Sequence, residues 1–230
     1  TLSYRCADGS LLHGYHAWDE TLAGPHPGVL VVHEWWGLND YARRRARELA
    51  ALGYNALAID MYGEGRSATS MEGARELMQA ALASPPTLRE RFLAGFEQLR
   101  QLAQTDTRRL AAIGYCFGGR VVLDMARQGV PLAGVVSFHG LLGTATPATP
   151  GSVQAKVLVE HGDADSLVSA EDVARFEAEM RAADADYRVR HHADAPHAFS
   201  NPGSPGYQQA ADRNSWADMQ AFFAELFNRA

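Results

Sequence analysis

The sequence predicts an α/β fold in which helices cover both faces of a mostly parallel sheet. Apolar runs of strand length, bounded by turn residues, alternate along the chain with segments of helical period. Most of these runs are apolar throughout, which is typical of parallel strands that are buried on both faces. We expect a single domain over residues 1–230, because α/β chains of this length often fold as one unit.

The first half of the chain supplies two buried strands and three helices. "GVLVVHE" and "NALAIDM" are the strands, and the helix between them ends at Gly53, a residue that favours helix termination. Two further helices follow, and the pair Pro85-Pro86 separates them. The predicted elements are the strand 28–34, the helix within the segment 41–54, the strand 55–61, and the helices 70–83 and 87–104.

The second half continues the same alternation. A strand runs directly into a helix at Cys116, and the small, proline-rich loop 143–152 has strands of the same kind on either side. We therefore interpret this loop as a surface connection and not as a domain boundary. The predicted elements are the strands 108–116, 133–140, 155–163 and 187–193, and the helices 117–128, 170–183 and 207–227.

Composition excludes several classes of protein. The net charge is −6, and the basic run "RRRAR" at 43–47 is interleaved with apolar positions of a helix, so we interpret it as a solvated face and expect no nucleic-acid partner. Two cysteines, Cys6 and Cys116, do not predict a disulfide framework. No apolar run approaches the roughly 20 residues that cross a bilayer. We expect a cytoplasmic protein without a membrane partner.

The pentapeptide "GYCFG" at 114–118 has the form G-x-nucleophile-x-G and lies between a predicted strand and a predicted helix. Glycines without Cβ atoms let the strand and the helix approach closely around a strained central residue. The start of the helix favours a thiolate at Cys116 and offers the Phe117 N–H to an oxyanion. A tight turn with Cys116 as a small buried residue is the alternative, so the partners must decide.

A carboxylate and a histidine follow in the chain order that such a nucleophile requires. Asp163 and Asp165 both lie after the strand 155–163, and we choose Asp165 because it falls in the loop before the next helix; a cap or turn role is the alternative for each. His197 lies in the loop after the last strand, whereas the alternatives His191 and His192 lie within that strand on opposite faces.

Metal binding is a weaker interpretation of the same segments. His191, Asp194 and His197 could converge in space, but their spacing matches no zinc pattern. "HEWWG" at 33–37 begins like a zinc-protease motif and has glycine where the second histidine would stand. We therefore expect no metal and no cofactor.

The chain resembles the dienelactone hydrolase family of the α/β-hydrolase superfamily along essentially its whole length. The motifs that carry the resemblance are "HEWWGLN", "DMYGEGR", "GYCFGGR", "HGDADSLV" and "PHAF". The resemblance implies an α/β-hydrolase fold without a large cap domain. It also implies that Cys116 is the nucleophile, His197 the base and Asp165 the residue that orients the base.

Three further roles are implied by the same resemblance. Glu34 would contact the cysteine and, because a second negative charge is disfavoured beside a carboxylate, would hold the resting thiol neutral. A strand-end carboxylate paired with a nearby arginine is the alternative for Glu34. The backbone N–H groups of Trp35 and Phe117 would form the oxyanion hole.

The substrate pocket departs from the family pattern. Family members that act on an anionic lactone carry an arginine four residues after the histidine, where this chain has Asn201. Arg66 is a candidate to compensate, although nothing in the sequence places it, and we expect both Asn201 and Arg66 in the substrate pocket. Trp36 and Phe199, with Trp35 and Phe117, suggest an aromatic, uncharged pocket.

We therefore expect a hydrolase of small neutral esters or lactones that forms an acyl-cysteine. A promiscuous organophosphate triesterase that uses the same cysteine is the first alternative, and a non-catalytic binding protein on a hydrolase scaffold is the second. The partner would be a small molecule, and the sequence is compatible with a monomer or a homodimer.

Overall fold

The computed structural model describes residues 1–227, which divide into two compact units, one over residues 1–112 and one that begins at Ile113. Eight strands form a mostly parallel sheet with helices packed against it, so the predicted α/β class is confirmed. Strand β5 (Thr105–Tyr115) begins in the first unit and ends in the second. The division thus falls within β5 and not at the loop 143–152, and one domain for the whole chain stays a prediction.

In the first unit the strand order is β1-β2-β4-β3-β5. Strands β3 and β4 are parallel, whereas β2 runs antiparallel to both β1 and β4. The sequence does not predict β1 or β2, because they are short, contain polar residues and are only partly buried. The bounds are β1 Leu2–Arg5, β2 Leu11–Ala17, β3 His26–Val32 and β4 Asn55–Ile59.

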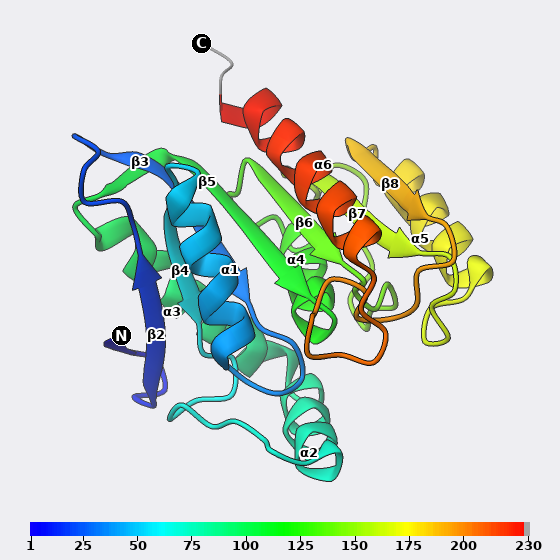
Figure 1. Cartoon of the computed structure of the whole chain (residues 1–230), viewed down its shortest axis with the longest axis horizontal. Coiled ribbons are helices and arrows are strands. Elements are labelled where there is room, and N and C mark those ends of the chain that lie inside the picture. Colours follow the sequence, from blue (N-terminus) through cyan, green and yellow to red (C-terminus); the bar gives the residue numbers. More distant parts are fainter. Residues whose placement is uncertain (228–230) are drawn as a thin grey trace. The chain divides into compact units, whose positions relative to one another are not determined.

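Helices cover both faces of the sheet within the first unit. Helix α1 (Asp40–Ala51) packs on β3 and β4 from one side, and α3 (Pro85–Gln101) packs on them from the other (Figure 1). The side chain of Asn39 accepts two backbone hydrogen bonds and so fixes the start of α1. Helix α2 (Met71–Leu82) packs on α3. Pro85 and Pro86 form the first turn of α3 instead of separating the helices, because N–H groups there have no helical partner.

In the second unit β5 continues into the order β5-β6-β7-β8, in which β6, β7 and β8 are parallel. Helix α6 lies in front of β6 and β7 in Figure 1, and α4 lies behind them. Within residues 1–227, no helix combines the length and the apolar character needed to cross a membrane. The bounds are α4 Phe117–Arg127, β6 Gly134–Phe138, β7 Lys156–Gly162, α5 Ala170–Ala182, β8 Tyr187–His192 and α6 Gln209–Phe227.

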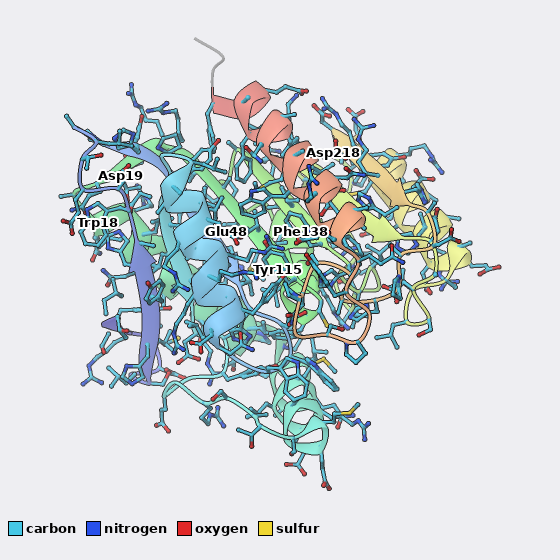
Figure 2. The ribbon with its side chains drawn as sticks, in the orientation of Figure 1. Trp18, Asp19, Glu48, Tyr115, Phe138 and Asp218 are labelled. Carbon is cyan, nitrogen blue, oxygen red and sulfur yellow. The ribbon has the colours of Figure 1, made fainter. Side chains whose placement is uncertain are left out.

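The carboxyl ends of β6, β7 and β8 lie at one edge of the sheet, as parallel pairing requires. Beneath this edge Tyr115 stacks on Phe138 with ring centroids 4.8 Å apart, and both residues are labelled in Figure 2. Both rings are buried, so they provide a rigid base for the segments that follow the strands. The predicted ends of these elements agree with the observed ends to within a few residues.

Candidate active site

Cys116 lies at the junction of β5 and α4, at the N-cap position of the helix. Its backbone has φ 53° and ψ −112°, a left-handed conformation that is costly for a residue with a Cβ atom. The N–H of Cys116 donates to the carbonyl of Phe138 at 3.0 Å, which ties the turn to β6. The Cys116 side chain makes no capping hydrogen bond to α4, so the helix start does not engage the thiol that the sharp turn holds in place.

Glycines make this turn sterically feasible. A Cβ atom at Gly114 would lie 2.0 Å from the carbonyl oxygen of Gly118, and one at Gly119 would lie 2.7 Å from the Cα atom of Gly140. Only glycine therefore lets the end of β5, the first turn of α4 and the end of β6 approach this closely. The steric reason that the sequence suggested for "GYCFG" holds at Gly114.

Asp165 and His197 come together from the loops that follow β7 and β8. His197 Nδ1 donates to Asp165 Oδ2 at 2.8 Å, and the second oxygen, Oδ1, accepts the backbone N–H of Leu167 at 2.8 Å. The Asp165 side chain is fully buried, and that of His197 is 17% exposed. With both of its oxygens engaged, the carboxylate holds the imidazole in one orientation and directs Nε2 away from itself.

Cys116 lies close enough to His197 to change its titration. Burial opposes protonation, but the hydrogen bond to Asp165 and the interaction with Cys116 outweigh it and raise the pKa of His197 to about 10. Nε2 is buried and, among the described residues, has no hydrogen bond of ordinary geometry, so the interaction with the sulfur is not a well-aligned bond. The surroundings favour the imidazolium, which is the form that accompanies a thiolate.

Two polar residues that the sequence does not single out lie beside the histidine. The ring of His139, directly after β6, makes an edge contact with that of His197 at 5.4 Å, and its Nε2 lies 2.7 Å from Ser200 Oγ. His139 has a φ of 40°, an unusual value for a non-glycine residue. A histidine directly after a buried strand, in "SFHG", is the sequence signal that could have identified it.

Phe199 belongs to the packing beneath this loop. It is fully buried in a cluster with Ala195 and Ala211, and its ring contacts those of His139 and His192. An aromatic ring with no accessible surface cannot form an open pocket wall. The interpretation of Phe199 as a pocket residue is therefore corrected: it supports the loop that carries His197.

The alternative histidines at the end of β8 have other partners. His192 is buried and pairs with Glu160 at 2.6 Å, and burial, partly offset by this histidine, raises the pKa of Glu160 to about 7. His191 is half-exposed and pairs with Asp163 at 2.6 Å. Of the groups in residues 1–227 with metal-binding spacing, none contains Asp194 or His197, so the metal trio considered from sequence does not form.

Glu34, Trp35 and Trp36 lie in the first unit, directly after β3. Glu34 is buried, and its carbonyl accepts the N–H of Gly37 at 3.3 Å. The carbonyl of Trp35 accepts the hydroxyl of Tyr62 at 2.9 Å, and the two indole rings meet edge to face at 5.1 Å. The segment is thus held in a defined conformation within its unit. The predicted roles of these three residues toward Cys116 and the substrate stay predictions.

Arg66 and Asn201 have local partners. The Arg66 guanidinium donates to the carbonyls of Tyr62 and Gly63, and it lines a small cavity of the first unit together with Arg91. Asn201 Oδ1 accepts the N–H of Gly203 at 2.9 Å and so stabilises a turn. Both side chains have structural roles in their own segments, and their predicted contacts with substrate stay predictions.

Comparisons with known proteins identify the family of the chain. The sequence profile of the dienelactone hydrolase family matches residues 12–227. A relative from Yersinia pestis, named as a carboxymethylenebutenolidase, is 29% identical over 95% of this chain and 85% of its own length. A relative from Escherichia coli K12 with the same name is 27% identical over 95% of this chain and 84% of its own length.

Solved structures give the same result. The protein m3DLH is 38% identical, with a TM-score of 0.91 and 98% of both chains covered. The dienelactone hydrolase-like promiscuous phosphotriesterase P91, from metagenomic libraries, is 37% identical, with a TM-score of 0.90 over 98% of this chain and 97% of that one. The predicted α/β-hydrolase fold is confirmed, and residues 1–227 contain no large cap domain.

Proposed function

The chain belongs to the dienelactone hydrolase family and is a hydrolase of that type; we propose that it cleaves small neutral esters or lactones through an acyl-cysteine at Cys116. The observation that carries the proposal is the fixed pair His197–Asp165, 2.8 Å apart, with Cys116 on a strained turn close enough to raise the pKa of the histidine. The order of cysteine, aspartate and histidine along the chain is the order that this fold uses for a nucleophile, an orienting acid and a base.

Before the first half of the proposed reaction the thiol proton of Cys116 passes to His197 Nε2, and Asp165 stabilises the resulting imidazolium. The thiolate attacks the ester carbonyl carbon, and the carbonyl π electrons move to its oxygen. That oxyanion accepts the N–H of Phe117 at the start of α4, where the helix dipole favours negative charge. The intermediate collapses, the ester C–O bond breaks, and His197 gives its proton to the leaving alkoxide.

Hydrolysis of the thioester repeats these steps with water as the nucleophile. His197 takes a proton from water, the hydroxide adds to the thioester carbonyl, and the C–S bond breaks with departure of the Cys116 thiolate. The products are a carboxylic acid and an alcohol, or a hydroxy acid from a lactone. The family resemblance assigns the second oxyanion donor to Trp35 and a role in setting the charge of the thiol to Glu34.

A preference for neutral substrates follows from position 201. Family members that bind an anionic lactone carry an arginine at the position of Asn201. Asparagine lacks the charged fork with which arginine pairs with a carboxylate. Phosphotriesters are the second candidate substrates, because the 37% identical neighbour P91 is described as a promiscuous phosphotriesterase. A neutral phosphotriester also offers a P=O oxygen to the same N–H donors.

The test is turnover of neutral aryl esters by the wild type and by Cys116→Ala. Loss of the nucleophile is expected to lower kcat by at least about a thousandfold. Activity near that of the wild type would show that Cys116 is not the nucleophile. A stopped assay with a paraoxon-type triester addresses the second candidate: continuing turnover after a burst supports it, and a burst without steady state shows that phosphorylated Cys116 is a dead end.

A further inference from the structure

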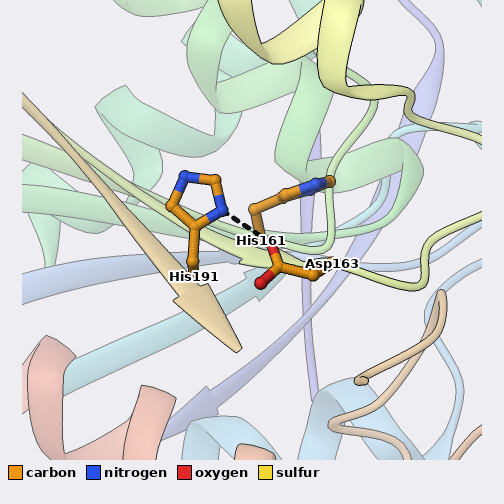
Figure 3. A group of neighbouring side chains, drawn as sticks. All are labelled: His161, Asp163 and His191. Atoms are coloured by element: carbon orange, nitrogen blue, oxygen red, sulfur yellow. Dashed lines mark hydrogen bonds and ion pairs between the residues drawn. The ribbon is translucent and has the colours of Figure 1, made fainter. Parts of the chain in front are cut away.

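A second histidine–carboxylate cluster lies at the carboxyl edge of β7 and β8, outside the pair formed by His197 and Asp165. His161 on β7 and His191 on β8 are direct partners in the parallel register, so their side chains leave the same face of the sheet. Asp163 follows β7 directly, and its N–H donates to the carbonyl of His192 on β8. Figure 3 shows the three side chains converging from the two strand ends.

The geometry of this cluster suits a metal ion. His191 Nδ1 and Asp163 Oδ1 are 2.6 Å apart, and the rings of His161 and His191 are nearly perpendicular with centroids 5.6 Å apart. One potential ligand atom from each residue lies within 4.8 Å of the other two. Tetrahedral zinc with bonds of about 2.0–2.2 Å holds its ligand atoms roughly 3.3–3.6 Å apart. Small side-chain rotations that separate His191 Nδ1 from Asp163 Oδ1 and admit the ion between them would complete the site.

The cluster is also accessible to an ion from solution. The side chains of His191 and Asp163 are 50% and 45% exposed, whereas His161 is nearly buried and forms the floor. Two imidazoles and one carboxylate are a ligand set that zinc and its first-row neighbours prefer, and water can take the remaining position. The open side provides the entry path that a metal site requires.

We propose that His161, Asp163 and His191 form a binding site for a divalent transition-metal ion of the zinc type, distinct from the catalytic cysteine. Imidazole binds metal as the neutral base, so an ion that takes His191 Nδ1 and Asp163 Oδ1 leaves the one N–H proton of the ring on Nε2; a ring that starts as the imidazolium gives its second proton to solvent. No change of oxidation state is involved. The ion would link β8 to the loop that continues from Asp163 to Asp165, and so stabilise the carboxylate that orients His197.

Two other groups in residues 1–227 have metal-binding spacing and are weaker candidates. Glu160 and His192 pair with each other next to Asp218, but both are buried, so an ion would have to lose its water to enter. Cys6 lies near Asp8 and Glu90, but the cysteine is buried in an apolar cluster with Tyr4 and Leu12. Of the three groups in the described residues, the cluster of His161, Asp163 and His191 is the one that combines two imidazoles with access from solvent.

Cobalt(II) titration of the full chain tests the proposal, because visible absorption reports the ligands. The titration uses Cys116→Ser, which removes the catalytic thiol, and adds His191→Ala or Asp163→Asn. Asp194→Asn is the matched control, since it removes a carboxylate from the neighbouring loop and asparagine tolerates the φ of 56° at that position. We expect one ion per chain in Cys116→Ser and in the control, and at least about tenfold weaker binding in the two ligand variants.

Thermal unfolding with and without zinc checks that each variant is folded and gives a second measure of zinc binding. Zinc is expected to raise the Tm of Cys116→Ser and of the Asp194→Asn control, and to leave the Tm of the ligand variants unchanged. Equal binding by the ligand variants and the control would overturn the proposal. The proposal would also be overturned if the wild type bound cobalt with thiolate charge-transfer absorption and Cys116→Ser did not bind it. Loss of binding in Asp218→Asn would place the ion at Glu160 and His192 and would likewise overturn the proposal.

Discussion

Two histidine–aspartate pairs lie near the carboxyl ends of β7 and β8 in the second unit, and they differ in burial far more than in the distance between their members. Asp165 and His197 are 2.8 Å apart, and Asp163 and His191 are 2.6 Å apart. The first carboxylate is fully buried and its histidine is 17% exposed, whereas the second pair is 45% and 50% exposed. A short contact therefore does not by itself distinguish the proposed catalytic pair from the other. Burial fixes one pair in a single geometry, while water and ions can reach the other.

The largest expected difference between the two pairs is in catalysis. Asp165→Asn is expected to lower kcat by about 10²–10⁴-fold, because the amide cannot hold the histidine in the required tautomer. Asp163→Asn should change kcat by less than about fivefold, which corresponds to the roughly 1 kcal/mol that an exposed pair contributes. Both are measured as aryl-ester turnover in protein freed of metal with a chelator. Similar losses in the two variants would mean that burial does not distinguish their roles.

Sequence order identified the catalytic candidates because the fold places each of them in the turn or loop that follows a strand. The segment "HGDADS" contains two aspartates, and the prediction chose Asp165 because it follows Gly162 by three residues, in the loop before α5; Asp165 is the one that meets His197. Cys116 was placed correctly at the turn between β5 and α4, because only glycine fits at Gly114.

The remaining features depend on contacts that no local pattern encodes. The pairing of His161 with His191 is set by the register of β7 against β8, which is decided by packing along the whole of both strands. His139 meets Ser200 only because the loop after β8 folds back over β6. An aromatic residue such as Phe199 has the same sequence signature in a core as in a pocket, so its full burial could not be predicted.

A second prediction concerns the titration of His197 and its dependence on Cys116. The cysteine is one of the causes that raise the pKa of His197 to about 10, so this pKa should fall in Cys116→Ala. It should also fall in Asp165→Asn, because the hydrogen bond from Nδ1 to the carboxylate is then lost. Proton NMR of the imidazole ring against pH measures both changes. An unchanged pKa in Cys116→Ala would show that the thiol does not interact with the ring.

The smallest expected effect is on the pH dependence of stability. Because the pKa of His197 is about 10 in the folded protein and about 6.5 in the unfolded chain, the folded state binds more protons between these values. The resulting stabilisation is complete below pH 6.5 and is lost as the pH rises through 10, so the free energy of unfolding should decline over this window. In His197→Gln, which cannot bind the proton, the decline should be shallower, and Cys116→Ala should fall between the two. Urea unfolding at several pH values measures the slopes, and parallel curves for wild type and His197→Gln would mean that the buried pair gains no stability from the proton on its histidine.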